Sequence, residues 1–230
     1  MTTTTGSRIL LDALGEVRDP ELDEPITTLG FVASASLSPD GDAAVHLRLP
    51  TYFCAPNFAY LMVADAYDAV STVDGVRRVE VVLDDHFAAD AINEGIAARA
   101  GFVASFPEEA VDELDTLRIN FLRKAVLAGT DQVCRPLVDA GATPADLAAL
   151  TLGTVPPSPA LARLRRRRAE LGLPSGDDAP LLVDPGSGDP VGAPEVPLHL
   201  RKARLTRTSL DANTGICSGM LRHRYGLEET

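Results

Sequence analysis

The sequence predicts an α+β protein, in which a small α/β domain is followed by a helical region and an extended tail. Residues 1–87 show helical and alternating apolar patterns in the order helix, strand, strand, helix, strand. Residues 88–172 carry apolar side chains at helical spacing. Residues 173–230 begin with a segment, 174–197, in which 10 of 24 residues are proline or glycine. That composition is typical of an extended, irregular segment.

The first three elements follow from local patterns. A helix is expected from Ser7, which is of a residue type that caps helix N-termini, to the stop at Asp19-Pro20. Residues 31–37 and 44–49 alternate with period two, and Ser38-Pro39-Asp40-Gly41 between them has turn composition. The two alternating segments therefore predict a β-hairpin.

The hairpin leads through a short loop, residues 50–55, into a second helix. Pro56 suits the first helical position, where a missing N–H costs little. Asp74-Gly75 ends this helix, and the valine-rich residues 76–83 predict a third strand. Further helices are expected over residues 87–101, 107–128, 131–140, 144–152 and 158–171.

The charge distribution excludes some functions. The chain has 33 acidic and 21 basic residues, and 21 of the acidic but only 7 of the basic ones lie in residues 1–120. Such acidity argues against nucleic-acid and anionic-membrane binding. No apolar run approaches the roughly 18 residues that a membrane span needs, and no secretory signal is visible, so we expect a cytoplasmic protein.

Two basic groups stand out in the second half of the chain. The first, in residues 163–168, predicts a solvated helix face or an intramolecular partner for the acidic first half. The second comprises Arg201, Lys202, Arg204 and Arg207, and it fits the same interpretation or an acidic protein partner. Phosphate-binding glycine loops and a Gly-x-Ser-x-Gly elbow are absent from the sequence.

The three cysteines are too few for a disulfide framework. Cys54 directly precedes the second helix, whose N-terminal dipole favours thiolate, the form that binds soft metals; the alternative is an inert, space-filling cysteine. Cys217 lies between Gly215 and Gly219 with basic residues after it, which predicts an activated thiol on a flexible loop, or a tail cysteine without a role. Cys134 fits a packing role.

Taken together, several short motifs resemble the small iron–sulfur or metal–sulfur cluster assembly domains of the PaaD and SufT type. The resemblance covers roughly residues 7–87 and rests on Asp19-Pro20-Glu21, Ile26, Leu29-Gly30, Pro50-Thr51-Tyr52, Cys54, Pro56 and Gly75-Val76. It implies an α/β domain that acts as an accessory factor in metalloprotein maturation, with Cys54 as the functional thiol. The PaaD branch further implies a multicomponent di-iron monooxygenase, or its iron–sulfur reductase, as the client.

The chain departs from the family pattern at two places. Cys54-Ala55-Pro56 stands where Cys-Pro is usual, and Asp84-Asp85-His86-Phe87 replaces a closing Asp-Pro-x-Trp-like segment. The second departure either recruits His86 as a metal ligand or removes a client contact. A polar loop after a strand is the plainer interpretation of His86. Asp19 and Glu21 could likewise be oxygen ligands or general bases, or solvated acids at a helix stop.

The function that the sequence favours is a non-enzymatic maturation factor, which transiently holds an iron–sulfur cluster or iron for a client metalloenzyme. Cys54, Cys217 and His86 are the expected ligands. Because no Cys-x-x-Cys pair is present, we expect a homodimer whose thiolates converge on one cluster. The alternative is a metal-free interaction subunit or chaperone that clamps a partner through its C-terminal extension. An enzyme with Cys54 as nucleophile is a third possibility, which would need a nearby base.

Overall fold

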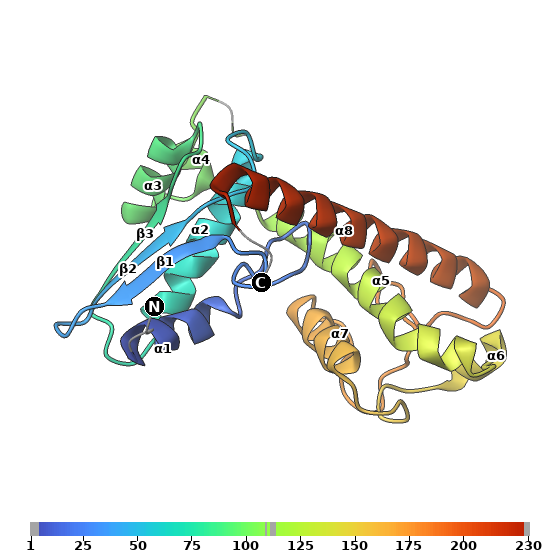
Figure 1. Cartoon of the computed structure of the whole chain (residues 1–230). Coiled ribbons are helices and arrows are strands. Elements are labelled where there is room, and N and C mark those ends of the chain that lie inside the picture. The colour runs from blue at the N-terminus through green and yellow to red at the C-terminus, as the bar shows by residue number, and fades with distance from the viewer. Residues whose placement is uncertain (1–4, 109, 111–113, 228–230) are drawn as a thin grey trace. The chain divides into compact units, whose positions relative to one another are not determined.

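The computed structural model describes residues 5–108, 110 and 114–227 and confirms the α+β fold (Figure 1). The chain divides into two compact units, each with its own apolar core. The first unit contains residues 1–115 and 213–230, and the second contains residues 116–212. The boundaries expected at residues 87 and 172 are not boundaries between these two units, and the three-part division stays a prediction.

A three-stranded mixed sheet organises the first unit, in the order β1 (Val32–Leu37), β2 (Asp42–Leu47) and β3 (Arg78–Leu83). Strands β1 and β2 form the expected antiparallel hairpin, while β2 and β3 are parallel. The hairpin turn needs Gly41, which has a φ of 87° and whose added Cβ would lie 2.5 Å from the Gly75 carbonyl oxygen.

Helices supply the other half of this core. Helix α1 (Thr5–Leu14) contacts β1 and α2, and α2 (Pro56–Ser71) connects the parallel strands and contacts β3. Helices α3 (Ala89–Ala97) and α4 (Phe102–Ser105) follow β3, and α3 contacts α2 and β3. The buried strand residues alternate along each strand, which places them on one face of the sheet: Ala43, Val45, Leu47, Val81 and Leu83.

The extended C-terminal tail is a wrong prediction for most of its length. Residues 174–195 are irregular as expected, but helix α8 (Val196–Tyr225) has 30 residues and includes both Gly215 and Gly219. Each interior glycine costs a helix roughly 1 kcal/mol. Packing against the core of the first unit offsets this cost, because Leu221 is 1% exposed there and Cys217 is packed against the same cluster.

The second unit is helical around an irregular segment. Helix α5 (Asp115–Asp139) is continuous where two helices were expected, and it carries Pro136 within its last turn. Residues 109 and 111–113 of the expected helix lie outside the described residues. Two short helices follow, α6 (Pro144–Ala149) and α7 (Pro159–Glu170). Thr143 and Asp146 form a capping box that fixes the start of α6.

The arginine run on α7 is not the solvated face that the sequence predicts. Arg167 and Arg168 are 6% and 0% exposed. Arg168 donates to the Pro180 and Leu181 carbonyl oxygens, at 2.8 and 2.5 Å, and so ties the irregular segment to α7. Arg165 pairs with Asp177 within the second unit, rather than with the acidic first half. The run therefore organises its own unit.

The packing of α8 on the first unit is testable by truncating Leu221. We expect Leu221→Ala to lower the free energy of unfolding by about 2–4 kcal/mol, since it leaves a cavity beside the sheet domain. Urea denaturation followed by circular dichroism measures the change. Leu205→Ala is the matched control, because Leu205 lies on the same helix but is 66% exposed, and it should change stability by less than about 0.5 kcal/mol.

Candidate functional site

The candidate site lies where β2 and β3 end. Because the two strands are parallel neighbours, the loops that follow them meet at the same edge of the sheet. The Asp84 amide donates to the Leu47 carbonyl oxygen, and the Phe87 amide donates to the Tyr52 carbonyl oxygen, at 2.8 and 3.1 Å. The loop with Cys54 and the loop with His86 are thus joined along their backbones.

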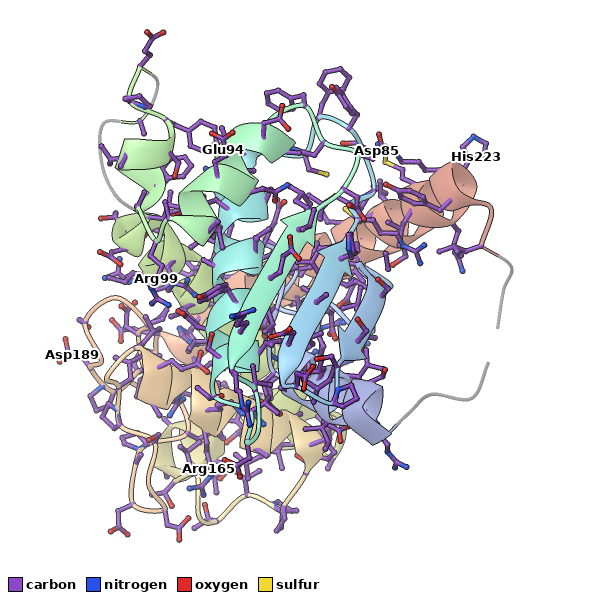
Figure 2. All side chains as sticks on the ribbon, turned by 90° about the vertical axis from the view of Figure 1, so that its left-hand side faces the viewer. Asp85, Glu94, Arg99, Arg165, Asp189 and His223 are labelled. Carbon is purple, nitrogen blue, oxygen red and sulfur yellow. The ribbon has the colours of Figure 1, made fainter. Side chains whose placement is uncertain are left out.

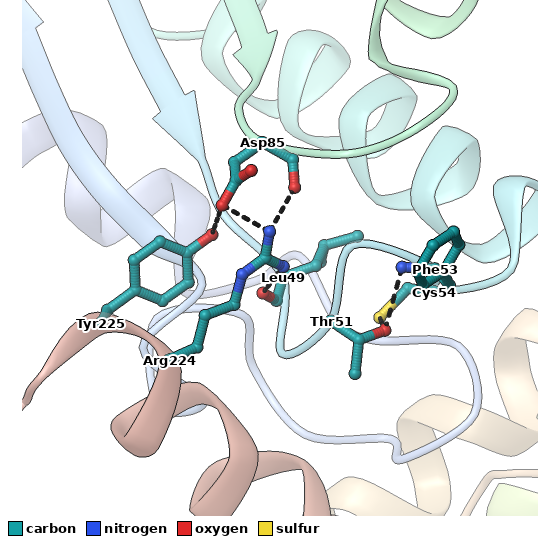
Figure 3. Close-up of polar contacts among 7 residues, drawn as sticks. All are labelled: Leu49, Thr51, Phe53, Cys54, Asp85, Arg224 and Tyr225. Atoms are coloured by element: carbon teal, nitrogen blue, oxygen red, sulfur yellow. Dashed lines mark hydrogen bonds and ion pairs between the residues drawn. The ribbon is translucent and has the colours of Figure 1, made fainter.

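Cys54 is half-buried at the end of the first of these loops. It directly precedes Ala55, the N-cap residue of α2, which provides no side-chain capping bond, and Pro56 takes the first helical position as expected. The Cys54 sulfur lies 3.3 Å from the Thr51 Oγ1, which also accepts a hydrogen bond from the Phe53 amide (Figure 3). Because that hydroxyl oxygen already accepts, its own hydrogen can be donated to the sulfur.

His86 fixes the backbone of Cys54. The His86 Nε2 donates to the Cys54 carbonyl oxygen at 2.7 Å, and the Nδ1 accepts from the Ala88 amide at 3.2 Å. Burial lowers the pKa of His86, with the Arg224 charge acting in the same direction and the bond to Cys54 opposing it. The neutral ring fits one donor and one acceptor. Both ring nitrogens of His86 form hydrogen bonds, so binding a metal would require one of these bonds to be replaced. The metal-ligand role of His86 stays a prediction.

Arg224 clamps the same two loops from the end of α8. Its guanidinium donates to the Leu49 carbonyl oxygen at 3.1 Å and to the Asp85 carbonyl oxygen at 2.7 Å, and it forms an ion pair with the Asp85 carboxylate (Figure 3). Figure 2 shows Asp85 at the end of α8 that carries His223. The Tyr225 hydroxyl lies 3.4 Å from the Asp85 Oδ2. Sequence analysis gave the basic residues after Cys217, which include Arg224, only an influence on that thiol and missed this clamp.

Cys217 reaches the same region from α8, not from a flexible loop. It is half-buried, and its pKa is raised to about 11, first by burial and then by its electrostatic interactions with Asp19, Cys54 and Glu21. The prediction that the basic residues after Cys217 activate its thiol is therefore wrong. The structure nevertheless brings the two candidate thiols, Cys54 and Cys217, close enough for the charge of one to act on the other.

Asp19 is buried rather than solvated, at 7% exposure. Its Oδ1 accepts from the Glu21 and Leu22 amides, both at 2.8 Å. Burial raises the pKa of Asp19 to about 6, against the lowering effect of these two hydrogen bonds. At neutral pH this carboxylate adds a buried negative charge beside Cys217.

These groups do not form a complete metal site by themselves. Among the described residues, no group of three or more His, Cys, Asp or Glu side chains has the geometry to hold a metal ion. Cys134 belongs to the core of the second unit, where it is 1% exposed and burial raises its pKa to about 12. That environment fits the packing role expected for Cys134.

Three exposed aromatic side chains surround the cysteine loop, and sequence analysis missed them as a group. Tyr52, Phe53 and Phe87 are 44%, 76% and 49% exposed. Their ring centroids lie 5.0 Å apart for Tyr52 and Phe53 and 5.9 Å apart for Phe53 and Phe87. We call this group the aromatic patch. Exposed aromatic clusters of this kind are typical of binding surfaces.

Comparison with known proteins finds a family that matches part of the first unit. Residues 8–81 match the family described as "Iron-sulfur cluster assembly protein". The match confirms the resemblance inferred from the motifs, and Cys54, Thr51 and Asp19 all lie within the matched residues. The region from residue 82 onward lies outside the match and includes Cys217, His86 and Arg224.

Relatives of known name are similar over the same part of the chain. A 72-residue segment, 31% of this chain, is 40% identical to the iron–sulfur cluster carrier proteins of Mycobacterium bovis and Mycobacterium tuberculosis, of which it covers 18%. An 85-residue segment is 29% identical to an uncharacterised protein of Methanocaldococcus jannaschii and covers 37% of this chain and 87% of that protein. No solved structure matches.

Within the described residues, none of the helices combines the length and the apolar character that crossing a bilayer requires.

The raised pKa of the buried Asp19 carboxyl predicts that the stability of the protein depends on pH. Because its folded pKa of about 6 lies above the ordinary 3.8, its contribution to stability is fully present below about pH 4 and is lost as the pH rises through 6. Asp19→Asn keeps an acceptor for the two amides without the charge. We expect the variant to be more stable than the wild type at pH 7.5, by up to about 3 kcal/mol, and the difference to vanish near pH 4.

Urea unfolding at half-unit pH steps measures this difference. Asp12→Asn on α1 is the matched charge-removal control, because Asp12 is exposed. A stability difference between Asp19→Asn and the wild type that stays constant from pH 4 to 7.5 would contradict the raised pKa of Asp19.

Proposed function

We propose that this chain is a non-enzymatic accessory factor that binds an iron–sulfur cluster, or the iron for one, transiently and delivers it to a client metalloenzyme. The observation that carries the proposal is the half-buried Cys54 thiol, held on a fixed loop inside the matched cluster-assembly domain. A carrier must both bind its cargo and release it. A thiol that is partly open to solvent suits both requirements better than a fully enclosed one.

Cys217 is the proposed second ligand. Its raised pKa keeps it protonated at neutral pH, which suits an empty carrier, because a neutral thiol adds no further charge to its acidic surroundings. A bound iron ion supplies the opposite charge and favours the thiolate, so loading of the cargo releases a proton. We therefore expect iron uptake through Cys217 to strengthen as the pH rises.

Two copies of the chain complete the proposed ligand set. An iron–sulfur cluster is commonly held by four protein ligands, and one copy offers two thiols in this region. A symmetric dimer would bring Cys54 and Cys217 of both copies around one cluster. The aromatic patch supports this arrangement, because it offers exposed apolar surface next to Cys54 that a second copy can cover.

The proposed client is a multicomponent di-iron monooxygenase. This part rests on the PaaD side of the resemblance. The first half of the chain is acidic, so we expect the client surface that binds it to carry basic residues.

The alternative of a metal-free clamp receives less support. It requires the C-terminal extension to be available for a partner, whereas Leu221 and Arg224 at the end of α8 are both engaged within the first unit. The alternative predicts that Cys54→Ser leaves client activation intact.

Anaerobic reconstitution with iron and sulfide tests the carrier proposal. We expect the wild type to bind up to one cluster per two chains, Cys54→Ala to bind at least tenfold less, and Cys217→Ala to bind less and to lose the rise of uptake with pH. Iron analysis, visible absorption and Mössbauer spectra measure the outcome. Cys134→Ala removes the remaining cysteine as a control and should load normally. Equal iron uptake by the wild type and Cys54→Ala would overturn the proposal.

The dimer is tested through the aromatic patch. We expect Phe53→Ser to weaken cluster-dependent dimerisation by at least fivefold, because it removes the most exposed ring of the patch while keeping Cys54. Analytical ultracentrifugation of loaded and unloaded protein measures the change. Ile9→Ser on α1 is the control, since Ile9 is a 44% exposed apolar residue outside the patch. Loaded protein that remains monomeric in the wild type would contradict the shared cluster.

A further inference from the structure

The second unit contains a recess that the proposed function does not use. It has a volume of about 320 Å³ and lies between α5 and the first half of α8, which run side by side in Figure 1 and are joined by the ion pair of Asp131 and Arg207. Its volume falls within the range of small-molecule sites. The residues that line it all belong to the second unit: Asp131, Cys134, Arg135, Val138, Asp139, Pro197, Leu200, Arg201 and Arg204.

Three arginines give the recess its charge. Arg135 comes from α5, and Arg201 and Arg204 come from α8, where the spacing of three residues places them on one face of the helix. All three are exposed, and among the described residues none of them has an ion pair or a hydrogen-bonded acidic partner. In a chain with a net charge of −12, three such cations around one recess are unexpected.

The acidic residues of the recess do not cancel this charge. Asp131 is 7% exposed and accepts from the Arg207 Nε at 2.5 Å, so its charge is already paired. Asp139 is exposed and is the other acidic side chain that lines the recess. The three arginines therefore leave a net positive charge there, and their mutual repulsion is relieved by a bound anion.

The remaining walls suit the organic part of a ligand. Val138, Pro197 and Leu200 contribute apolar surface. Cys134 contributes a neutral thiol, because its pKa of about 12 keeps it protonated, and a neutral thiol does not repel an anion. Guanidinium groups bind carboxylate and phosphate through two parallel hydrogen bonds.

We propose that this recess binds a small organic anion, whose carboxylate or phosphate group is held by Arg135, Arg201 and Arg204 and whose apolar part contacts Val138, Pro197 and Leu200. The proposal concerns a ligand that is neither the cluster nor the client, and it stands whether or not Cys54 carries iron. Its positive charge also distinguishes the recess from the acidic first half of the chain.

Isothermal titration calorimetry on the full chain tests the proposal, with sodium citrate and sodium pyrophosphate as probes at constant ionic strength. Citrate represents a polycarboxylate and pyrophosphate a phosphate ligand, and the tighter probe identifies the preferred group. We expect binding of at least one probe at one site per chain. Arg201→Gln with Arg204→Gln should weaken it at least tenfold, since two of the three cations are removed.

The matched control removes two exposed cations elsewhere. Arg8→Gln with Arg78→Gln changes the net charge by the same amount, but these residues lie on α1 and β3 of the first unit. It should leave the dissociation constant within twofold of the wild type. In ¹H–¹⁵N spectra, the probe should shift amide signals of residues 131–135, 137–139 and 198–204.

Three results would overturn the proposal. The first is that neither probe binds at millimolar concentration. The second is equal weakening in both double variants, which would show a response to overall charge and no site. The third is binding of several anions per chain with shifts spread over both units. Circular dichroism of each variant verifies that it is folded.

Discussion

The guanidinium of Arg224 holds the candidate site together. It binds the Leu49 carbonyl before the cysteine loop, the Asp85 carbonyl after β3, and the Asp85 carboxylate. Asp85 has a φ of 51°, a left-handed conformation that costs free energy in a residue other than glycine. Charge-assisted hydrogen bonds from an arginine offset this cost and fix the turn. With Asp85 fixed, His86 points back to the Cys54 carbonyl, and the thiol acquires a defined position.

The structure accommodates both departures from the pattern of the assembly domains that residues 7–87 resemble. In Cys54-Ala55-Pro56, Ala55 is the N-cap of α2 and Pro56 is its first helical residue. In Asp84-Asp85-His86-Phe87, the buried side chain of His86 joins the two loops. The local geometry of Cys54 thus depends on hydrogen bonds from residues that lie beyond the matched 8–81.

Sequence patterns predict the parts of the fold that depend on neighbours along the chain. The hairpin, α2 with its proline start, and β3 follow from period-two alternation, turn residues and capping, and their bounds are close to those observed. Three features depend on distant partners and have no local signal. Gly215 and Gly219 suggest a loop, but packing of Leu221 keeps α8 helical. The sequence around Arg168 predicts a solvated side chain, because its partners, the carbonyls of residues 180 and 181, are distant along the chain. The burial of Asp19 likewise has no signal in the residues next to it.

The discontinuity of the first unit has a consequence for synthesis. Its sheet and helices α1 to α4 are complete at residue 115, whereas its last segment, the end of α8, begins at residue 213. A ribosome makes the whole second unit between these points, and domains generally fold as the chain emerges. Until α8 is made, Arg224 and Cys217 are missing from the site. Before that point Arg224 does not bind the loop that carries Cys54, and the two-thiol arrangement forms only once α8 is present.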